Sequence, residues 1–186
     1  MPAAVVVLVE GASDAAVVRV LCAARDLDHG GIDVRDLGGV TNVGHHLRRL
    51  DATTRVLGLY DAPEQRFVLR GLRSAGHDVG DVSDLADRGF WMCDRDLEDE
   101  LIRALGPERV EAVLAELGEL ERFRAFQRQP QWRGRERAQQ LRRFAGTASG
   151  RKLVLARRLA EELTPDTTPA ALTALVDAIE SAAAPR

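Results

Sequence analysis

Acidic residues occur where three apolar runs of the chain end. Glu10 and Asp61 each follow a run of aliphatic residues, and the cluster Asp94-Arg95-Asp96-Leu97-Glu98 follows another. If these runs are parallel strands, their carboxyl ends meet at one edge of a sheet, where open α/β sheets bind ligands. Carboxylates gathered there repel one another unless a cation neutralises them, and hard oxygen ligands select Mg²⁺, Mn²⁺ or Ca²⁺. The set therefore predicts a divalent metal site, with Asp14 one helical turn beyond Glu10.

Each acid taken alone has a simpler explanation. Ser13 or Asp14 could cap the helix that follows Gly11, and an acid at the end of a strand commonly caps a helix or lies in a solvated loop. The metal site is favoured by the set as a whole and not by any single member.

Alternating apolar runs and helical periodicity predict an α/β fold, with a central, mainly parallel sheet flanked by helices. Strands are expected at about 4–10, 32–37, 55–60 and 89–93, and helices at about 14–24, 43–50 and 65–75. From Leu97 onward the pattern is helical, with helices expected at about 136–145, from Lys152, and at about 169–182. We therefore divide the chain into an α/β core, residues 1–105, and a helical, basic C-terminal region, residues 106–186.

Positive charge is concentrated in the C-terminal region. Between Arg122 and Arg158 there are 12 basic residues and one acid, although the net charge of the chain is −3. Such a segment predicts a surface that binds phosphates. The arginines that we take as candidate nucleic-acid contacts are Arg128, Arg133, Arg135, Arg142, Arg143 and Arg151.

Three aromatic residues, Phe123, Phe126 and Trp132, lie among these arginines. Aromatic rings next to guanidinium groups can stack on unpaired bases. The interpretation that we favour for the aromatics is an amphipathic helix, with Phe123 and Phe126 in the core and the arginines solvated.

Lys152 is the only lysine among 26 basic Lys and Arg residues. A chain that otherwise uses arginine and keeps one lysine suggests a position where a compact ammonium is needed, with chance retention as the alternative. Cys22 and Cys93 lie in apolar stretches without paired spacing, so we expect buried thiols. No apolar run approaches the roughly 20 residues that span a bilayer, and we expect a cytoplasmic protein with no membrane partner.

At the level of motifs, the chain resembles the topoisomerase-primase (TOPRIM) domain in the form found in overcoming lysogenization defect (OLD) nucleases. The resemblance rests on Val-Glu-Gly-Ala-Ser-Asp at 9–14, the apolar strand that ends at Asp61, and Asp-Leu-Glu-Asp-Glu-Leu at 96–101. It covers about residues 3–105 and returns at Ser149-Gly150-Arg151-Lys152.

The resemblance implies a Rossmann-like parallel sheet that binds one or two Mg²⁺ or Mn²⁺ ions and cuts phosphodiester bonds of DNA or RNA. It places the metal ligands at Glu10, Asp14, Asp61, Asp96 and Glu98, and the family's active-site lysine at Lys152. The residues that it makes catalytic are Glu10, Asp61 and Lys152.

Two features depart from the family. The third-strand motif is commonly Asp-x-Asp, but here it is Asp61-Ala62-Pro63; Glu64 is adjacent and need not point the same way. OLD nucleases also carry an ATPase domain ahead of this module, and no Gly-Lys-Ser/Thr phosphate loop occurs in this sequence. We therefore expect a stand-alone module, with a separate ATPase or a second copy of the chain as its partner.

The leading hypothesis is a metal-dependent endonuclease. One ion, held by Glu10 and Asp61, would activate the attacking water. A second ion, held by Asp14, Asp96 and Glu98, would stabilise the leaving oxygen, although the same spacings allow other partitions. Lys152 would neutralise charge on the phosphoryl oxygens.

Two other functions compete with this hypothesis. One is a non-catalytic module that binds nucleic acid or a partner and works with a separate ATPase; the missing acid at Pro63 supports it. The other is a phosphatase of the haloacid dehalogenase type, which needs Asp-x-Asp after the first strand, where Glu10-Gly11-Ala12 stands.

Overall fold

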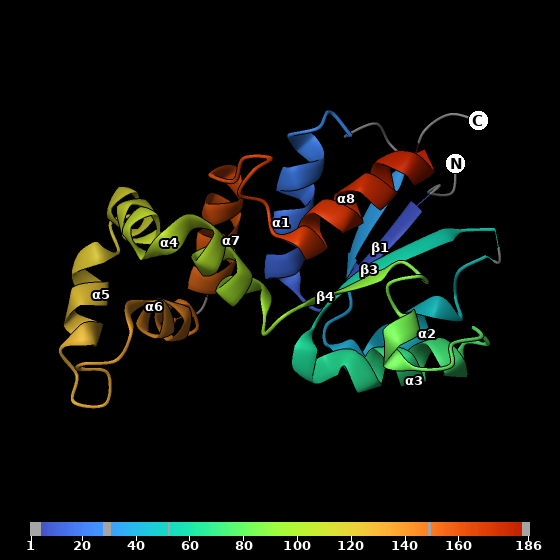
Figure 1. Cartoon of the computed structure of the whole chain (residues 1–186), viewed down its shortest axis with the longest axis horizontal. Helices are drawn as coiled ribbons and strands as arrows, with labels where there is room; N and C mark the ends of the chain where they lie inside the picture. Colours follow the sequence, from blue (N-terminus) through green and yellow to red (C-terminus); the bar gives the residue numbers. More distant parts are fainter. Residues whose placement is uncertain (1–4, 28–30, 52, 149, 184–186) are drawn as a thin grey trace.

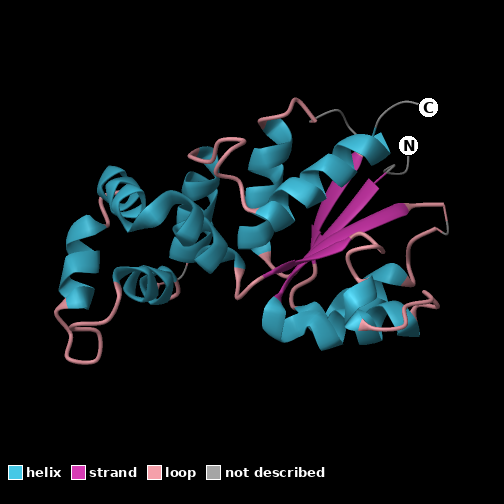
Figure 2. Ribbon diagram, viewed as in Figure 1, coloured by secondary structure: helices cyan, strands magenta, loops and turns pink. Residues whose placement is uncertain are grey.

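A four-stranded parallel sheet forms the centre of the N-terminal half (Figures 1 and 2). The computed structural model describes residues 5–27, 31–51, 53–148 and 150–183. Its strands are β1 (Val5–Val9), β2 (Ile32–Asp36), β3 (Arg55–Asp61) and β4 (Phe90–Cys93). They lie in the order β2-β1-β3-β4, so the two strands that end next to Glu10 and at Asp61 are neighbours at the centre of the sheet.

Helices connect these strands and continue after the last one. They are α1 (Ala12–Ala23), α2 (Val43–Leu47), α3 (Gln65–Ser74), α4 (Leu97–Glu116), α5 (Leu120–Gln127), α6 (Arg137–Ala145), α7 (Arg151–Glu161) and α8 (Ala170–Ala183), with 3₁₀ turns at Val40–Asn42, Ala62–Glu64 and Val82–Asp84. The α/β class, the parallel sheet and the helical C-terminal region are confirmed. The expected start of the first strand at residue 4 lies outside the described residues.

Both faces of the sheet are covered, which is why its strands are apolar almost throughout. Alternate side chains of β1 enter two different cores: Val5, Val7 and Val9 pack with α1 and α8, and Val6 and Leu8 pack with α2 and α3. Figure 1 shows α1 and α8 on one side of the sheet and α2 and α3 on the other. Packing on both faces therefore holds the sheet in place, and the acids that follow its strands lie at the edge formed by the carboxyl ends of the strands.

Helix α4 carries the chain away from this edge. It is kinked at Gly106, where φ is 76° and Pro107 follows. The division of the chain between residues 105 and 106 stays a prediction. Beyond it, α5 and α6 form the far end of the molecule, and α7 returns to pack on α1 (Figure 1). The helical region is thereby brought back to the core that its own chain left.

An aromatic cluster holds the far end together. Phe123 and Phe126 are buried, as expected, and Phe144 of α6 lies against both, with ring centroids 5.2 and 5.6 Å apart. Cys22 and Cys93 are buried too. Within the segments that the structure describes, no helix is long and apolar enough to cross a membrane.

Gly58 of β3 provides a test of this packing. A Cβ atom at Gly58 would lie 2.4 Å from the ring of Phe90, its partner on β4, and 3.3 Å from the carbonyl oxygen of Leu8. Because a packed sheet cannot absorb that overlap freely, we expect Gly58→Ala to lower the free energy of unfolding by about 1–3 kcal/mol, measured by urea denaturation.

Gly146→Ala is the matched control. Gly146 has an ordinary φ of −86°, and the nearest heavy atom to its added Cβ would be 3.8 Å away. Equal urea midpoints for Gly58→Ala and Gly146→Ala would contradict the close contact between β3 and β4.

Candidate active site

The acids that follow β1, β3 and β4 meet at one edge of the sheet. This follows from the parallel pairing, which aligns the carboxyl ends of the three strands. Their proximity is visible in the pKa of Asp61, which is raised to about 7, first by burial and then by the negative charges of Asp14, Asp96, Glu10 and Glu98. The predicted gathering of chain-distant carboxylates is thus present in the structure.

Asp14 combines a structural role with a buried charge. Its Oδ2 accepts a hydrogen bond of 2.8 Å from the backbone N–H of Gly11, so it caps the start of α1, as the simpler interpretation of this acid held. Only 8% of the residue is exposed, and burial raises the pKa of Asp14 to about 6 against the lowering effect of that bond. The cap therefore leaves a carboxyl group that is poorly solvated next to Glu10.

Glu64 joins the site, although the sequence alone left its direction open. The 3₁₀ turn at Ala62–Glu64, with Pro63 inside it, folds the chain back directly after Asp61. Burial, and then a side-chain hydrogen bond with Glu10, raise the pKa of Glu64 to about 8. Oε2 of Glu64 is buried and has no hydrogen-bond partner in the structure. Two carboxyl groups in such contact must share a proton or be neutralised by a cation.

Asp96 and Glu98 begin helix α4 and face the helical region. Asp96 Oδ1 accepts from the backbone N–H of Asp99 at 2.8 Å, and its Oδ2 accepts from Arg142 Nε at 2.6 Å. Glu98 is 7% exposed, and burial raises its pKa. Its Oε2 lies 3.1 Å from Lys152 Nζ, while Oε1 is buried without a hydrogen-bond partner.

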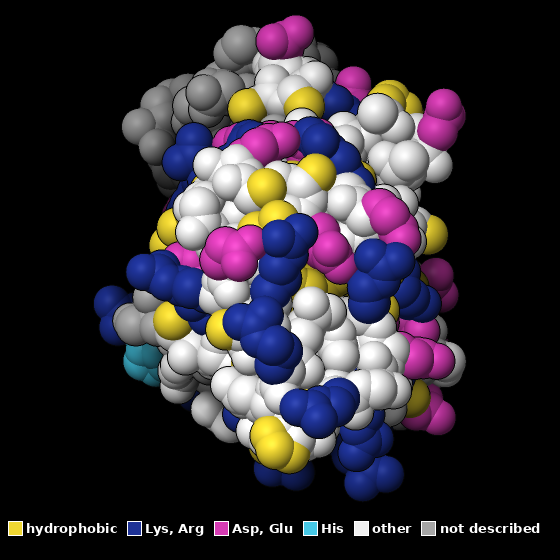
Figure 3. All heavy atoms as spheres, turned by 90° about the vertical axis from the view of Figure 1, so that its left-hand side faces the viewer, with side chains coloured by type: hydrophobic (Ala, Val, Ile, Leu, Met, Phe, Trp, Pro, Cys, Tyr) yellow, Lys and Arg dark blue, Asp and Glu magenta, His cyan; other side chains and the backbone are white. Residues whose placement is uncertain are grey.

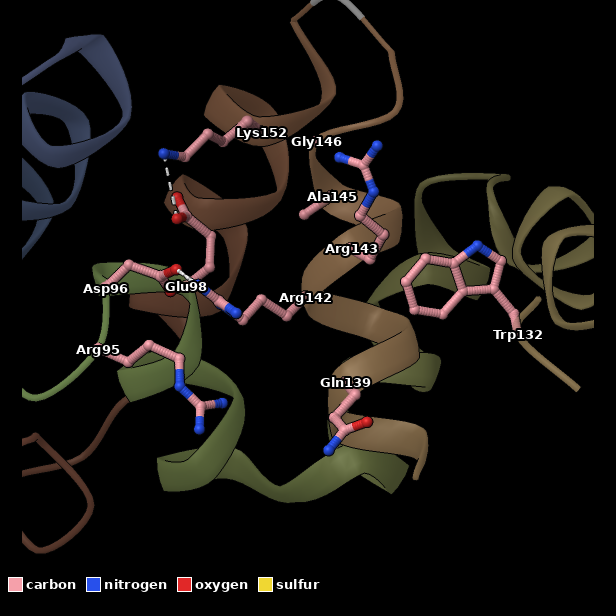
Figure 4. Close-up of a pocket in the computed structure, with 10 residues that line it drawn as sticks. All are labelled: Arg95, Asp96, Glu98, Trp132, Gln139, Arg142, Arg143, Ala145, Gly146 and Lys152. Atoms are coloured by element: carbon pink, nitrogen blue, oxygen red, sulfur yellow. Dashed lines mark hydrogen bonds and ion pairs between the residues drawn. The ribbon is translucent and has the colours of Figure 1, made fainter. Parts of the chain in front are cut away.

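Two cations from different helices neutralise this side of the site. Figure 4 shows Lys152 of α7 and Arg142 of α6 reaching towards Glu98 and Asp96. Lys152 lies in the first turn of α7, after Gly150 in a left-handed conformation with φ of 77°. Partial burial lowers the pKa of Lys152, but the charge and hydrogen bond of Glu98 outweigh it and raise the pKa. The lone lysine thus lies against the acids.

The six candidate nucleic-acid arginines fall into two groups. Arg142 is paired with Asp96, and Arg151 is 12% exposed, lies 2.8 Å from Glu119 and stacks over Phe144 at 4.0 Å. The other four are exposed and have no acidic partner in the described part of the chain: Arg128, Arg133, Arg135 and Arg143. Figure 3 shows Lys and Arg side chains running down the middle and over the lower half of the helical end of the molecule.

The carboxylate oxygens of these acids are the type of ligand that a hard cation prefers. Carboxylate oxygens with raised pKa values crowd together, and one oxygen each of Glu64 and Glu98 is buried without a partner. Among residues 5–27, 31–51, 53–148 and 150–183, however, no three His, Cys, Asp or Glu side chains are arranged so that they could hold a metal ion as they stand. A bound ion would therefore require some of these side chains to rotate.

Comparison with known proteins gives a family match for the N-terminal part of the chain. Residues 3–59 match the family model described as "Overcoming lysogenization defect protein-like, TOPRIM domain". The chain contains an OLD-like TOPRIM domain. The OLD-like TOPRIM domain includes β1, with Glu10 and Asp14 after it, and most of β3. No curated protein matches the chain at the level of sequence.

Two solved structures share the fold over nearly the whole chain. The C-terminal region of the Burkholderia pseudomallei OLD protein has a TM-score of 0.69 and 22% identity, covering 99% of this chain and 100% of the other. The C-terminal region of the Xanthomonas campestris pv. campestris OLD protein has a TM-score of 0.71 and 22% identity, covering 97% and 96%. The fold shared with those structures therefore covers the helical region as well as the OLD-like TOPRIM domain.

The raised pKa values predict how stability depends on pH. Asp14, Asp61 and Glu64 titrate near 4 when unfolded and at about 6, 7 and 8 when folded, so the folded chain binds protons more tightly. Their stabilising effect is present below pH 4 and is lost as the pH rises through the folded pKa values. In EDTA, we expect Tm measured by circular dichroism to fall from pH 5 to pH 8, and Mg²⁺ or Mn²⁺ to raise Tm mainly at pH 8.

Asp61→Asn should make this dependence shallower, because it removes one of the buried charges. Asp94→Asn is the control: Asp94 lies beside the site in sequence, but its side chain is 73% exposed and pairs with Arg103 at 3.2 Å. A Tm that rises from pH 5 to pH 8 in EDTA would show that the carboxylates do not repel one another in the folded protein.

Proposed function

We propose that the protein is a metal-dependent nuclease that hydrolyses phosphodiester bonds of DNA or RNA. The observation that carries the proposal is the meeting of buried carboxylates from three strand ends with a single ammonium, Lys152, inside a chain that contains an OLD-like TOPRIM domain. Carboxylates that raise one another's pKa need a cation, and a lysine beside them provides positive charge for a phosphate. Cationic side chains on the helical region support a polyanionic substrate.

The metal ligands in this proposal are Glu10, Asp14, Asp61, Asp96 and Glu98, with Glu64 added. Glu64 would supply the oxygen that the family pattern expects at Pro63, since its carboxyl group already lies against Glu10. Mg²⁺ or Mn²⁺ held there would lower the pKa of a water and stabilise charge on the departing oxygen. Asp96 has both oxygens engaged, so it would bind an ion only if Arg142 or the helix cap released it.

The chain's own cations complete the proposed chemistry. Lys152 is half exposed, with its ammonium between Glu98 and solvent, so it can contact a non-bridging phosphoryl oxygen without leaving the site. Its compact charge suits a position crowded by carboxylates better than a planar guanidinium does. Arg142 would orient Asp96 and, once displaced, offer a second donor to the phosphate.

A non-catalytic binding module is the second candidate. It is favoured by Pro63 in place of the family's second acid and by the lack of a closed metal-binding group among the described residues. The two candidates differ in turnover and not in affinity for nucleic acid, so an assay of cleavage separates them.

We expect the purified chain to nick or degrade DNA or RNA with Mg²⁺ or Mn²⁺ and not with EDTA. Glu98→Gln and Lys152→Met should each reduce the rate by about 100-fold or more, because each removes a charge that acts on the transition state. The assay follows supercoiled plasmid and labelled single-stranded DNA and RNA on gels.

Arg157→Met is the matched control for Lys152→Met. Arg157 lies on the same helix, is exposed and pairs with Glu161 at 3.1 Å, away from the acids. Circular dichroism should show that every variant is folded. Cleavage by folded Glu98→Gln and Lys152→Met at the rate of Arg157→Met would contradict the assigned roles, and no metal-dependent cleavage by the parent chain would favour the binding module.

A further inference from the structure

The cations between Arg122 and Arg158 are unevenly neutralised. Eight of the 12 have an acidic partner within 4 Å: Arg122, Arg124, Arg137, Arg142, Arg151, Lys152, Arg157 and Arg158. The remaining four, Arg128, Arg133, Arg135 and Arg143, have none in the part of the chain that the structure describes. All four lie between the end of α5 and the end of α6, on both sides of Trp132 in sequence.

Trp132, which lies between Arg128 and Arg133 in the sequence, is held in place by its neighbours. Its ring stacks on Phe126, with centroids 5.0 Å apart and planes at 25°. The buried Gln140 fixes its backbone: Gln140 Nε2 donates to the Trp132 carbonyl at 2.7 Å, and Gln127 Nε2 donates to Gln140 Oε1 at 2.6 Å. Trp132 packs against the core and remains partly exposed.

Two clefts border Trp132, and Arg143 lines both of them. One, of about 510 Å³, extends to Asp96, Glu98 and Lys152; in Figure 4 these acids lie at one end of it and Trp132 at the other. The second, of about 590 Å³, lies on the side of Gln129, Gln131 and Thr147. Trp132 thus lies between the cleft that reaches the carboxylate site and a second cleft, and of the four arginines without an acidic partner Arg143 lines both.

We propose that Trp132 stacks on an unpaired base and that Arg128, Arg133 and Arg143 bind phosphates of the same strand. The substrate class would be single-stranded nucleic acid, or a duplex with a single-stranded end. Both faces of a base inside a duplex are covered by its neighbours, so only an unpaired base can lie on an indole ring. An acidic protein surface would satisfy the arginines but would not use a rigidly held ring between two clefts. This inference rests on the proposed function only for the hydrolysis of the bound strand.

Binding in EDTA tests the inference on the full chain, because no cleavage then intervenes. The probes are three fluorescein-labelled DNAs measured by anisotropy: a 12-nucleotide oligothymidylate, a 12-base-pair hairpin closed by an ethylene-glycol loop that carries no bases, and an abasic 12-mer with the same phosphates. We expect the oligothymidylate to bind most tightly. Trp132→Leu should weaken its binding by about 5- to 100-fold, the range for loss of one stacked base, with little effect on the hairpin or the abasic strand.

Further variants separate stacking from charge. Trp132→Phe should fall between parent and Trp132→Leu, and Trp91→Phe on β4 controls for the loss of a tryptophan elsewhere. Arg143→Ala should weaken oligothymidylate and abasic strand equally and reduce the salt slope by about 0.7, whereas Arg124→Ala, whose guanidinium is paired with Glu121, should not. Thermal melting confirms that Trp132→Leu remains folded.

The inference is overturned if the abasic strand binds as tightly as oligothymidylate. It is also overturned if Trp132→Leu binds oligothymidylate as tightly as the parent chain does, or if this substitution weakens binding of the hairpin and of oligothymidylate equally. If none of the three DNAs shows salt-dependent binding, the inference is also overturned, and a protein partner for the arginines is then indicated. Failure of the proposed function is distinguishable: base-dependent binding through Trp132 without metal-dependent cleavage would leave this inference standing and the nuclease proposal wrong.

Discussion

Repulsion among buried carboxylates is the constraint on which the site depends. Parallel strands bring their carboxyl ends to one edge, and in this chain acids follow β1, β3 and β4 there. The repulsion persists because the residues are fixed by packing: Asp14 by the cap of α1, Asp61 at the end of a buried strand, and Glu98 at the start of α4. The fold therefore maintains a local charge that an isolated cluster of acids would relieve by moving apart.

The neutralising charges are distributed unequally across the site. On the side of the helical region, Arg142 and Lys152 pair with Asp96 and Glu98. On the side of the sheet, Asp14, Asp61 and Glu64 have raised pKa values and no ion-pair partner among the described residues. An added cation would therefore relieve the most repulsion on the side of the sheet. On the other side, Arg142 and Lys152 of the helical region already neutralise the acids.

The sequence was sufficient to predict those parts of the site that depend on chain direction alone. Strand and helix periodicity located β1, β3 and β4, and the edge rule then grouped Glu10, Asp61 and the acids after β4. Glu64 could not be placed in this way, because its direction depends on the 3₁₀ turn that Pro63 helps to form and on its contact with Glu10. A proline directly after a strand-ending acid is the local signal that could have indicated such a reversal.

The basic segment shows why composition overstates a binding surface. Its 12 cations and single acid predicted a phosphate-binding region, but the acids that pair with these cations in the described structure all come from outside the segment, such as Glu119 for Arg151 and Glu116 for Arg158. Periodicity within the segment cannot reveal partners that only the tertiary fold supplies. Because ion pairs within the chain already hold most of these guanidinium groups, the described cations of this segment that have no acidic partner are Arg128, Arg133, Arg135 and Arg143. In the proposed binding mode, selectivity then depends on the ring of Trp132, because guanidinium groups alone contact the phosphates of any nucleic acid in the same way.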